Sequence, residues 1–131
     1  SMKCIHVFAI AAYGESPWLE SCIRSLKAQT SLSPIILCTS TPSRFLEETA
    51  EKYRLPLYVR DGISSIRDDW NYAYKMADAD FVTIAHQDDM YHREYGAELL
   101  RAAERWPDMT VFTTDYAIVK GAKLIQSDSL L

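Results

Sequence analysis

Two hydrophobic patterns alternate along the chain. Short runs of consecutive apolar residues, many of them β-branched, are typical of strands buried on both faces. Longer segments repeat apolar residues every three or four positions, which indicates helices with one buried face. The predicted strands are residues 3–12, 34–38, 57–59, 81–85 and 110–119, and the predicted helices between them are residues 18–28, 44–53, 66–76 and 94–106. A turn at Lys120-Gly121 and a short returning strand over 123–126 complete the prediction.

This alternation predicts right-handed βαβ units and a three-layer, Rossmann-like α/β fold, with a mostly parallel sheet and helices on both faces. The chain has 131 residues, of which 48% are hydrophobic, and this suits a single domain with a substantial core. Ser16-Pro17 and Thr41-Pro42 resemble helix caps followed by proline at the first helical position. Helical spacing assigns three large aromatic side chains to the core: Trp70, Tyr74 and Trp106.

Charge and cysteine content narrow the class of protein. The formal net charge is −4 and no basic patch stands out, which argues against nonspecific binding of nucleic acid. An anionic substrate would therefore need local cations or a metal ion. The odd set of Cys4, Cys22 and Cys38 lies in apolar runs and predicts reduced core thiols in a cytoplasmic protein. No apolar segment is long enough to span a membrane.

The stretch Phe81–His92 is the best candidate for chemistry. A buried strand stops there at His86-Gln87-Asp88-Asp89. In open α/β sheets, ligands bind in the crevice beyond the carboxyl ends of the strands. Two acids and nearby histidines at such a place could hold a divalent cation and, through it, a phosphorylated ligand. The alternative is a solvated acidic loop that caps the next helix.

Phosphate binding by a glycine-rich loop is not indicated. The predicted strand ends contain neither a Walker loop nor a dinucleotide glycine fingerprint, and the chain has only four glycines. A metal ion held by carboxylates is another device for a diphosphate, because it neutralises the charge of the leaving group. Asp88-Asp89 is the only adjacent pair of acids at a predicted strand end.

Four segments in order resemble the N-terminal half of a family-2 glycosyltransferase with the GT-A fold. They cover residues 4–91 and read FAIAAYGESPWLESCIRSLKAQT, PIILCTSTPS, GISSIRDDWNYAY and ADADFVTIAHQDDMY. The resemblance implies that Asp88 is the metal ligand of the Asp-x-Asp motif and that Asp89 lies near the donor sugar and metal. It also implies that Arg67 approaches the nucleotide base, and that Ala11 and Tyr13 pack against the base and ribose. The implied cofactor is Mn²⁺ or Mg²⁺.

Two departures from the family pattern concern the same site. His86 stands where the first acid of Asp-x-Asp is expected; histidine can ligate manganese but brings no negative charge. Thr39 and Ser40 occupy the donor-site position of two acids, one of which normally contacts the base. Asp61 or Asp68 could take over that contact.

The reaction implied for the complete enzyme is hexosyl transfer from a nucleotide diphosphate sugar, with UDP favoured, to a hydroxyl of a glycan or lipid-linked acceptor. The expected location is cytoplasmic, extending to the inner membrane face. The catalytic base is expected beyond Leu131, so residues 1–131 would be a single nucleotide-sugar-binding domain, the N-terminal part of a longer one. Two alternatives are a non-catalytic nucleotide-sugar-binding or regulatory module and a flavodoxin-like domain. An open sheet edge after residues 110–119 would also favour a homodimer.

Several of these residues have ordinary alternatives. His86 could be a polar strand end with one backbone hydrogen bond, and His92 fits the start of the following helix better than a ligand role. Arg67 could pair with Asp68 or Asp69 on the surface. Asp115, on the last predicted strand, is assigned as an edge residue.

Overall fold

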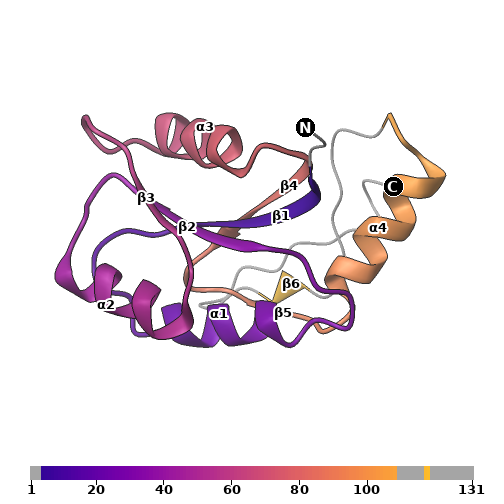
Figure 1. The fold of residues 1–131 in the computed structure, drawn as a ribbon, viewed down its shortest axis with the longest axis horizontal. Coiled ribbons are helices and arrows are strands. Elements are labelled where there is room, and N and C mark those ends of the chain that lie inside the picture. The colour runs from indigo at the N-terminus through magenta and orange to yellow at the C-terminus, as the bar shows by residue number, and fades with distance from the viewer. Residues whose placement is uncertain (1–3, 109–116, 119–131) are drawn as a thin grey trace.

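The computed structural model describes residues 4–108 and 117–118. Its main sheet has four parallel strands in the order β3-β2-β1-β4 (Figure 1). These strands are β1 (Cys4–Ala11), β2 (Ile35–Thr39), β3 (Leu57–Val59) and β4 (Ala79–His86). The sequence predicted all four, and the fold confirms the three-layer, parallel α/β architecture.

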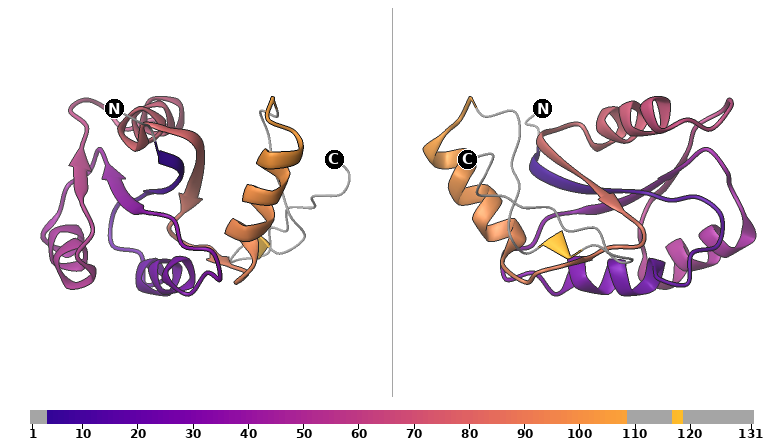
Figure 2. Two further views of the ribbon diagram at one scale, coloured as in Figure 1. Left: turned by 45° about the vertical axis from the view of Figure 1, so that its right-hand side comes forward. Right: turned by 180° about the vertical axis from the view of Figure 1, so that it is seen from behind.

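Helices cover both faces of this sheet (Figures 1 and 2). One face carries α1 (Leu19–Lys27) and α2 (Arg44–Tyr53), and the other carries α3 (Ile66–Ala77). The chain runs from β1 through β2 to β3 on one side and then crosses back to place β4 on the other side of β1. Right-handed crossovers require the helices to change face at this reversal, which is why α3 lies opposite α1 and α2. The helix α4 (Tyr95–Arg105) follows at one end of the sheet.

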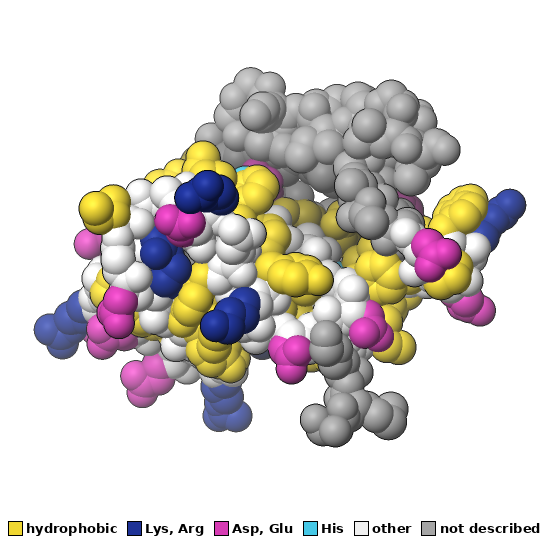
Figure 3. Space-filling model, turned by 90° about the horizontal axis from the view of Figure 1, so that it is seen from above, with side chains coloured by type: hydrophobic (Ala, Val, Ile, Leu, Met, Phe, Trp, Pro, Cys, Tyr) yellow, Lys and Arg dark blue, Asp and Glu magenta, His cyan; other side chains and the backbone are white. Residues whose placement is uncertain are grey.

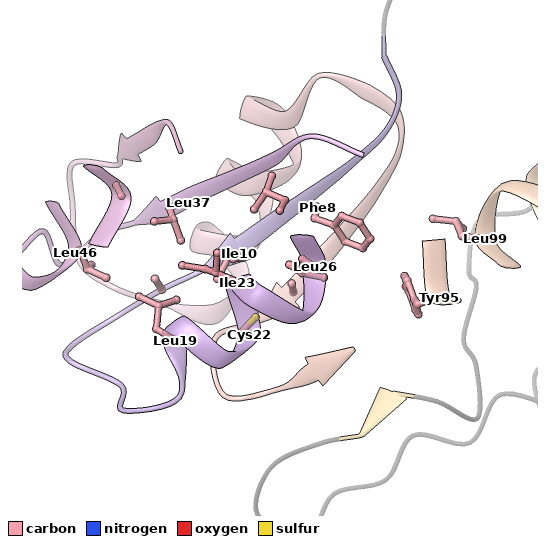
Figure 4. Packing of buried hydrophobic residues seen from close by; sticks show 14 residues of the cluster. Phe8, Ile10, Leu19, Cys22, Ile23, Leu26, Leu37, Leu46, Tyr95 and Leu99 are labelled. Carbon is pink, nitrogen blue, oxygen red and sulfur yellow. The ribbon is translucent and has the colours of Figure 1, made fainter. Parts of the chain in front are cut away.

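The core is divided by the sheet because successive strand residues point to opposite faces. Phe8 and Ile10 of β1 pack toward α1, α2 and α4, and Val7 and Ala9 pack toward Ala73 of α3. Figure 4 shows the larger of the two clusters, in which α1 is the main contributor of side chains. Its fully buried members on α1 are Leu19, Cys22, Ile23 and Leu26.

Two of the four described helices begin at serine caps. The hydroxyl of Ser43 accepts from Leu46 N–H, and that of Ser65 accepts from Asp68 N–H, both at 3.1 Å. The predicted cap at Thr41-Pro42 is therefore wrong by two residues. The predicted cap at Ser16 is also wrong, because the N-cap of α1 is Trp18 and makes no side-chain cap bond.

Some side chains predicted to be buried are not. Trp106 is 50% exposed and lies against the Arg105 guanidinium, and Cys4 is exposed, unlike the other two cysteines. On α3 the predicted apolar stripe is half solvent-facing, with Trp70 39% and Tyr74 59% exposed. The buried residue of α3 is the small Ala73, so this helix buries little of its larger apolar side chains against the sheet.

A second, two-stranded sheet pairs β5 (Met90–Tyr91) with β6 (Ala117–Ile118) in antiparallel fashion. β5 was not predicted from the sequence. Most of the predicted strand 110–119 lies outside the described residues, as do the turn and returning strand after it and Asp115. The flavodoxin-like alternative is wrong, because β3 pairs with β2 and β6 pairs antiparallel with β5. None of the described helices is long and apolar enough to cross a membrane.

Candidate functional site

The candidate site lies between β1 and β4, where the order in which strands are added to the sheet reverses. β1 and β4 lie side by side in parallel register, so that Ala11 is opposite His86 at their carboxyl ends. Neighbouring strands whose connections run to opposite faces leave a crevice between their outgoing loops. The loop after β1 begins with Ala12 and Tyr13, and the loop after β4 begins with Gln87 and Asp88.

A cavity of about 200 Å³ opens at this point between the sheet and α3. That volume is smaller than the 300–1,000 Å³ of sites that enclose whole drug-sized ligands. It suits one ring system, such as a nucleobase, with the rest of a ligand lying outside. The lining residues come from the ends of β1, β2 and β4 and from the first turns of α3: Ala11, Ala12, Tyr13, Cys38, Thr39, Ile66, Asp69, Trp70, Tyr72 and His86.

The two outgoing loops are tied together by Gln87. Its side-chain amide accepts from Tyr13 N–H at 3.2 Å and donates to Tyr13 C=O at 2.8 Å. Gln87 is buried, whereas the Tyr13 ring is exposed at the mouth of the cavity. The loop after β1 is therefore held by its backbone and leaves its aromatic ring available for a ligand.

The two adjacent acids have different surroundings. Asp89 is 5% exposed, and its backbone N–H donates to His86 C=O at 3.0 Å. Asp88 is half-buried, and its Oδ1 accepts a short hydrogen bond from Ser16 Oγ. That hydroxyl also accepts from Trp18 N–H, so Ser16 orients Asp88 and the start of α1 together.

Asp69, an acid that was not predicted as a site residue, lies in the cavity wall. Asp69 of α3 pairs with Arg60, whose Nε and Nη2 both approach Oδ1, at 3.0 and 2.9 Å. Both side chains are mostly buried, at 17% exposed for Arg60 and 24% for Asp69. Such a pair is more firmly oriented than a surface ion pair.

The hydroxyls predicted to contact the donor are used within the protein. Thr39 Oγ1 accepts from Thr41 N–H at 2.9 Å and lies 3.3 Å from Thr41 Oγ1. Ser40 Oγ lies 2.8 Å from Ser64 Oγ and joins the loop after β2 to the loop before α3. Thr39 still lines the cavity, and Ser40 does not.

Aromatic side chains form much of the remaining wall. Trp70 meets the His86 ring edge-on, with ring centroids 5.2 Å apart. Figure 3 looks onto the α3 side of the molecule, where hydrophobic side chains gather at the surface among charged ones. The exposed apolar residues of this segment are Ile63, Ile66, Trp70 and Tyr74. The assignment of Trp70 to the core is thus corrected to a place in the cavity wall.

The structure brings together part of the predicted site. Ala11, Tyr13, Thr39 and His86 line one cavity, whereas Ser40, Arg67, Asp88 and Asp89 lie outside its lining. Arg67 is exposed and lies 3.5 Å from Asp68, the surface pair considered as its alternative. His92 lies just before α4, where its Nδ1 accepts from Glu94 N–H. The roles of the predicted site residues toward a ligand stay predictions.

The predicted metal ligands do not form a site by themselves. Among residues 4–108 and 117–118, no group of three or more His, Cys, Asp or Glu side chains is placed to hold a metal ion. Of the predicted ligands His86, Asp88 and Asp89, Asp88 is the best placed, since its Oδ2 takes no hydrogen bond from the described part of the chain. A cation there would need further ligands from a bound molecule. Mg²⁺ is commonly held in this way, by one or two carboxylates and substrate phosphates.

A parallel sheet of this strand order, with a crevice at the reversal between β1 and β4, defines a Rossmann-like α/β fold of the GT-A type. The sequence profile of Glycosyl transferase family 2 matches residues 7–129. The chain therefore belongs to glycosyl transferase family 2.

Solved structures agree on the fold. Residues 1–349 of S. aureus TarS superpose with a TM-score of 0.67 at 16% identity, covering 87% of this chain and 39% of that one. The same TarS fragment in complex with UDP gives 0.62 at 20% identity, covering 79% and 32%. A 4-diphosphocytidyl-2C-methyl-D-erythritol synthase gives 0.62 at 11% identity, covering 97% and 69%. The chain thus spans about two fifths of the TarS fragment's length. No curated protein sequence matches the chain.

Proposed function

We propose that this chain carries the donor site of a glycosyltransferase and binds a nucleotide diphosphate sugar at the crevice between β1 and β4. The observation that carries the proposal is the cavity at the switch point of the sheet, with Tyr13 and Trp70 in its wall. Aromatic rings bind the faces of nucleobases by stacking. Family membership and the likeness to a UDP-bound fragment of TarS support a nucleoside diphosphate as the ligand.

In this arrangement the base occupies the cavity and the diphosphate extends toward Asp88, two residues beyond His86 in the cavity wall. Asp88 Oδ2 would contribute one ligand to Mn²⁺ or Mg²⁺, and the diphosphate oxygens and water would complete the shell. When bound, the cation would neutralise the charge that develops on the leaving diphosphate. The protein's own part is to orient Asp88, through Ser16, before the ligand arrives.

The transfer itself needs an acceptor hydroxyl and a base that removes its proton. We propose a hexose as the transferred sugar and a glycan or lipid-linked molecule as the acceptor. The catalytic base is not among the residues proposed here and is expected beyond residue 131.

The test is a binding titration of the 131-residue chain with UDP, GDP, CDP and ADP, each with Mn²⁺, with Mg²⁺ and with EDTA. We expect at least one nucleoside diphosphate to bind and to raise the melting temperature, with a larger effect when metal is present. No shift with any of the four, under any of the three conditions, would exclude the donor site. Binding without sugar transfer by the full-length protein would instead favour the non-catalytic module.

A further inference from the structure

We propose that Asp69 selects the nucleobase: its carboxylate Oδ2 accepts a hydrogen bond from the N3–H of a uracil ring in the cavity beside α3. The acid that contacts the base would then come from α3 and not from the end of β2. This inference rests on the proposed donor site and adds the residue that gives it base specificity.

The pairing with Arg60 leaves one oxygen of Asp69 unoccupied. Arg60 Nε and Nη2 both approach Oδ1, and no other residue of the described chain donates to Oδ2. Asp69 lines the cavity, whereas Arg60 does not. The carboxylate therefore presents a single oriented acceptor to a ligand, and the adjacent guanidinium offsets the cost of desolvating the charge when a ring covers it.

Arg60 is itself fixed from several sides. Its Nη1 donates to Asp61 C=O at 3.2 Å, its Nη2 donates to Ile63 C=O at 2.6 Å, and its backbone N–H donates to Thr39 C=O at 2.8 Å. Gly62 allows the loop to fold around the guanidinium, with φ at +119° and only 3.0 Å between an added Cβ and Nη1. A group held in this way loses little freedom when a ligand binds, which favours its use in recognition.

The other polar groups near the cavity are less suited to this contact. The Thr39 hydroxyl is engaged by Thr41, and the Ser40 hydroxyl by Ser64. Asp68 pairs with Arg67, and its side chain is 47% exposed. Neither Asp61 nor Asp68 lines the cavity. Asp69 is therefore the one carboxylate that the described structure places in the cavity wall.

The single acceptor matches the imide edge of uracil. That edge offers one N–H between two carbonyl groups. Cytosine and adenine place an unprotonated ring nitrogen at the same point, which a carboxylate repels, and guanine offers two adjacent donors that a single oxygen does not satisfy together. Tyr13 and Trp70 in the wall provide ring faces for stacking, which is tolerant of base identity. Stacking would supply affinity, and Asp69 would supply discrimination.

The decisive variant is Asp69→Asn, measured by calorimetric titration of the 131-residue chain with UDP and CDP in the presence of Mn²⁺. The amide keeps an oxygen for Arg60 and replaces Oδ2 by an NH₂ donor, which suits N3 of cytosine. We expect UDP to bind about ten- to hundredfold more weakly, as for a hydrogen bond to a charged group, and CDP to bind more tightly. Asp68→Asn is the matched control and should leave the ratio of the two dissociation constants unchanged.

A chemical probe tests the same contact without any substitution. N3-methyl-UDP lacks the imide proton, and we expect it to bind the unmodified chain about ten- to hundredfold more weakly than UDP. Equal binding of the two would overturn the role of Asp69, as would an unchanged preference for UDP over CDP in Asp69→Asn, and either result would leave the donor site standing. Failure of the unmodified chain to bind any nucleoside diphosphate would overturn both proposals.

Discussion

The side-chain amide of Gln87 forms hydrogen bonds with both backbone polar groups of Tyr13, 74 residues away in the sequence. The side-chain amide thus forms the two hydrogen bonds that a backbone residue of a neighbouring strand would form, just beyond the last paired residues of β1 and β4. The position of the Tyr13 ring therefore depends on a side chain in the loop after β4.

Replacing Gln87 by alanine should weaken nucleotide binding more than it weakens folding. Tyr13 lies at the surface, so water can replace the lost backbone contacts, and the free energy of unfolding should fall by only about 1 kcal/mol. The loop would no longer hold its ring at the cavity, and we expect the dissociation constant for the best nucleoside diphosphate to rise severalfold. Calorimetry and chemical denaturation would measure the two effects.

Gln29 provides the matched control for this variant. It is also buried, and it bonds to Ser25 C=O, His92 C=O and Gly96 N–H, away from the cavity. Gln29→Ala should cost at least as much stability, about 1–3 kcal/mol, because it leaves the buried Gly96 N–H unsatisfied. Nucleotide affinity should not change. Equal losses of affinity in both variants would show that Gln87 acts only through general stability.

Asp88→Asn should remove the metal dependence of nucleotide binding. The amide can still accept from Ser16 but has no negative charge for a cation. We expect the gain in UDP affinity on adding Mn²⁺, roughly tenfold for the unmodified chain if the ion–carboxylate contact is worth about 1.4 kcal/mol, to disappear. Affinity in EDTA should stay the same. Asp80→Asn, at an exposed position of β4, is the control, and a metal effect that survives in Asp88→Asn would place the cation elsewhere.

Trp70→Ala should weaken binding of every nucleoside diphosphate to a similar degree. Loss of a stacking face costs about 1–3 kcal/mol per base, which corresponds to a factor of roughly 5 to 150 in the dissociation constant. Tyr74→Ala removes another exposed aromatic ring from the same helix, but one outside the cavity lining. That variant should bind like the unmodified chain. Identical behaviour of the two variants would argue against a base in the cavity.

His6 should make the stability of the fold depend on pH. It is buried, its Nδ1 lies 2.8 Å from Ser33 Oγ, and its Nε2 lies 2.8 Å from Thr83 Oγ1. Burial lowers the pKa of His6 from 6.5 to about 4. The unfolded chain therefore binds the proton first as the pH falls, so the stability is complete above pH 6.5 and declines between pH 6.5 and 4. The total effect is roughly 3 kcal/mol.

Denaturant unfolding at a series of pH values would measure this effect. The interval between pH 6.5 and 5 is the most informative, because the unperturbed carboxylates titrate below it. His6→Gln should flatten the dependence in that interval, even if it lowers stability throughout. An unchanged slope in His6→Gln would assign the effect to another group.

The strands and helices were predictable from periodicity because burial in this fold follows local pattern. Phe8 and Ile10 alternate with Val7 and Ala9, and this alternation is visible in the sequence as an unbroken apolar run between two helical faces. The β5 strand was missed because two residues carry no period, and its pairing partners lie 26 and 28 residues further along.

The site was only partly predictable because its members are selected by contacts between distant segments. Ser16 has the local pattern of a helix cap, and only its contact with Asp88 reveals its other role. Trp70 has the spacing of a core residue, and helical periodicity does not distinguish a side chain in the core from one in a cavity wall. Asp69 left a usable signal: it precedes Ala73, the buried residue of α3, by four positions and so shares the face that packs on the sheet.

The parallel register of β1 and β4 has a consequence for variation among related sequences. Ala11 and His86 are opposite residues, and adjacent strands are about 4.8 Å apart, so the two loops of the crevice start from points whose separation the backbone ladder determines. Changes of length or composition in either loop alter what the crevice presents, but they leave the distance between the loop origins unchanged. Ligand preference can therefore diverge through substitutions in the loops and in α3 while the frame that holds them stays constant.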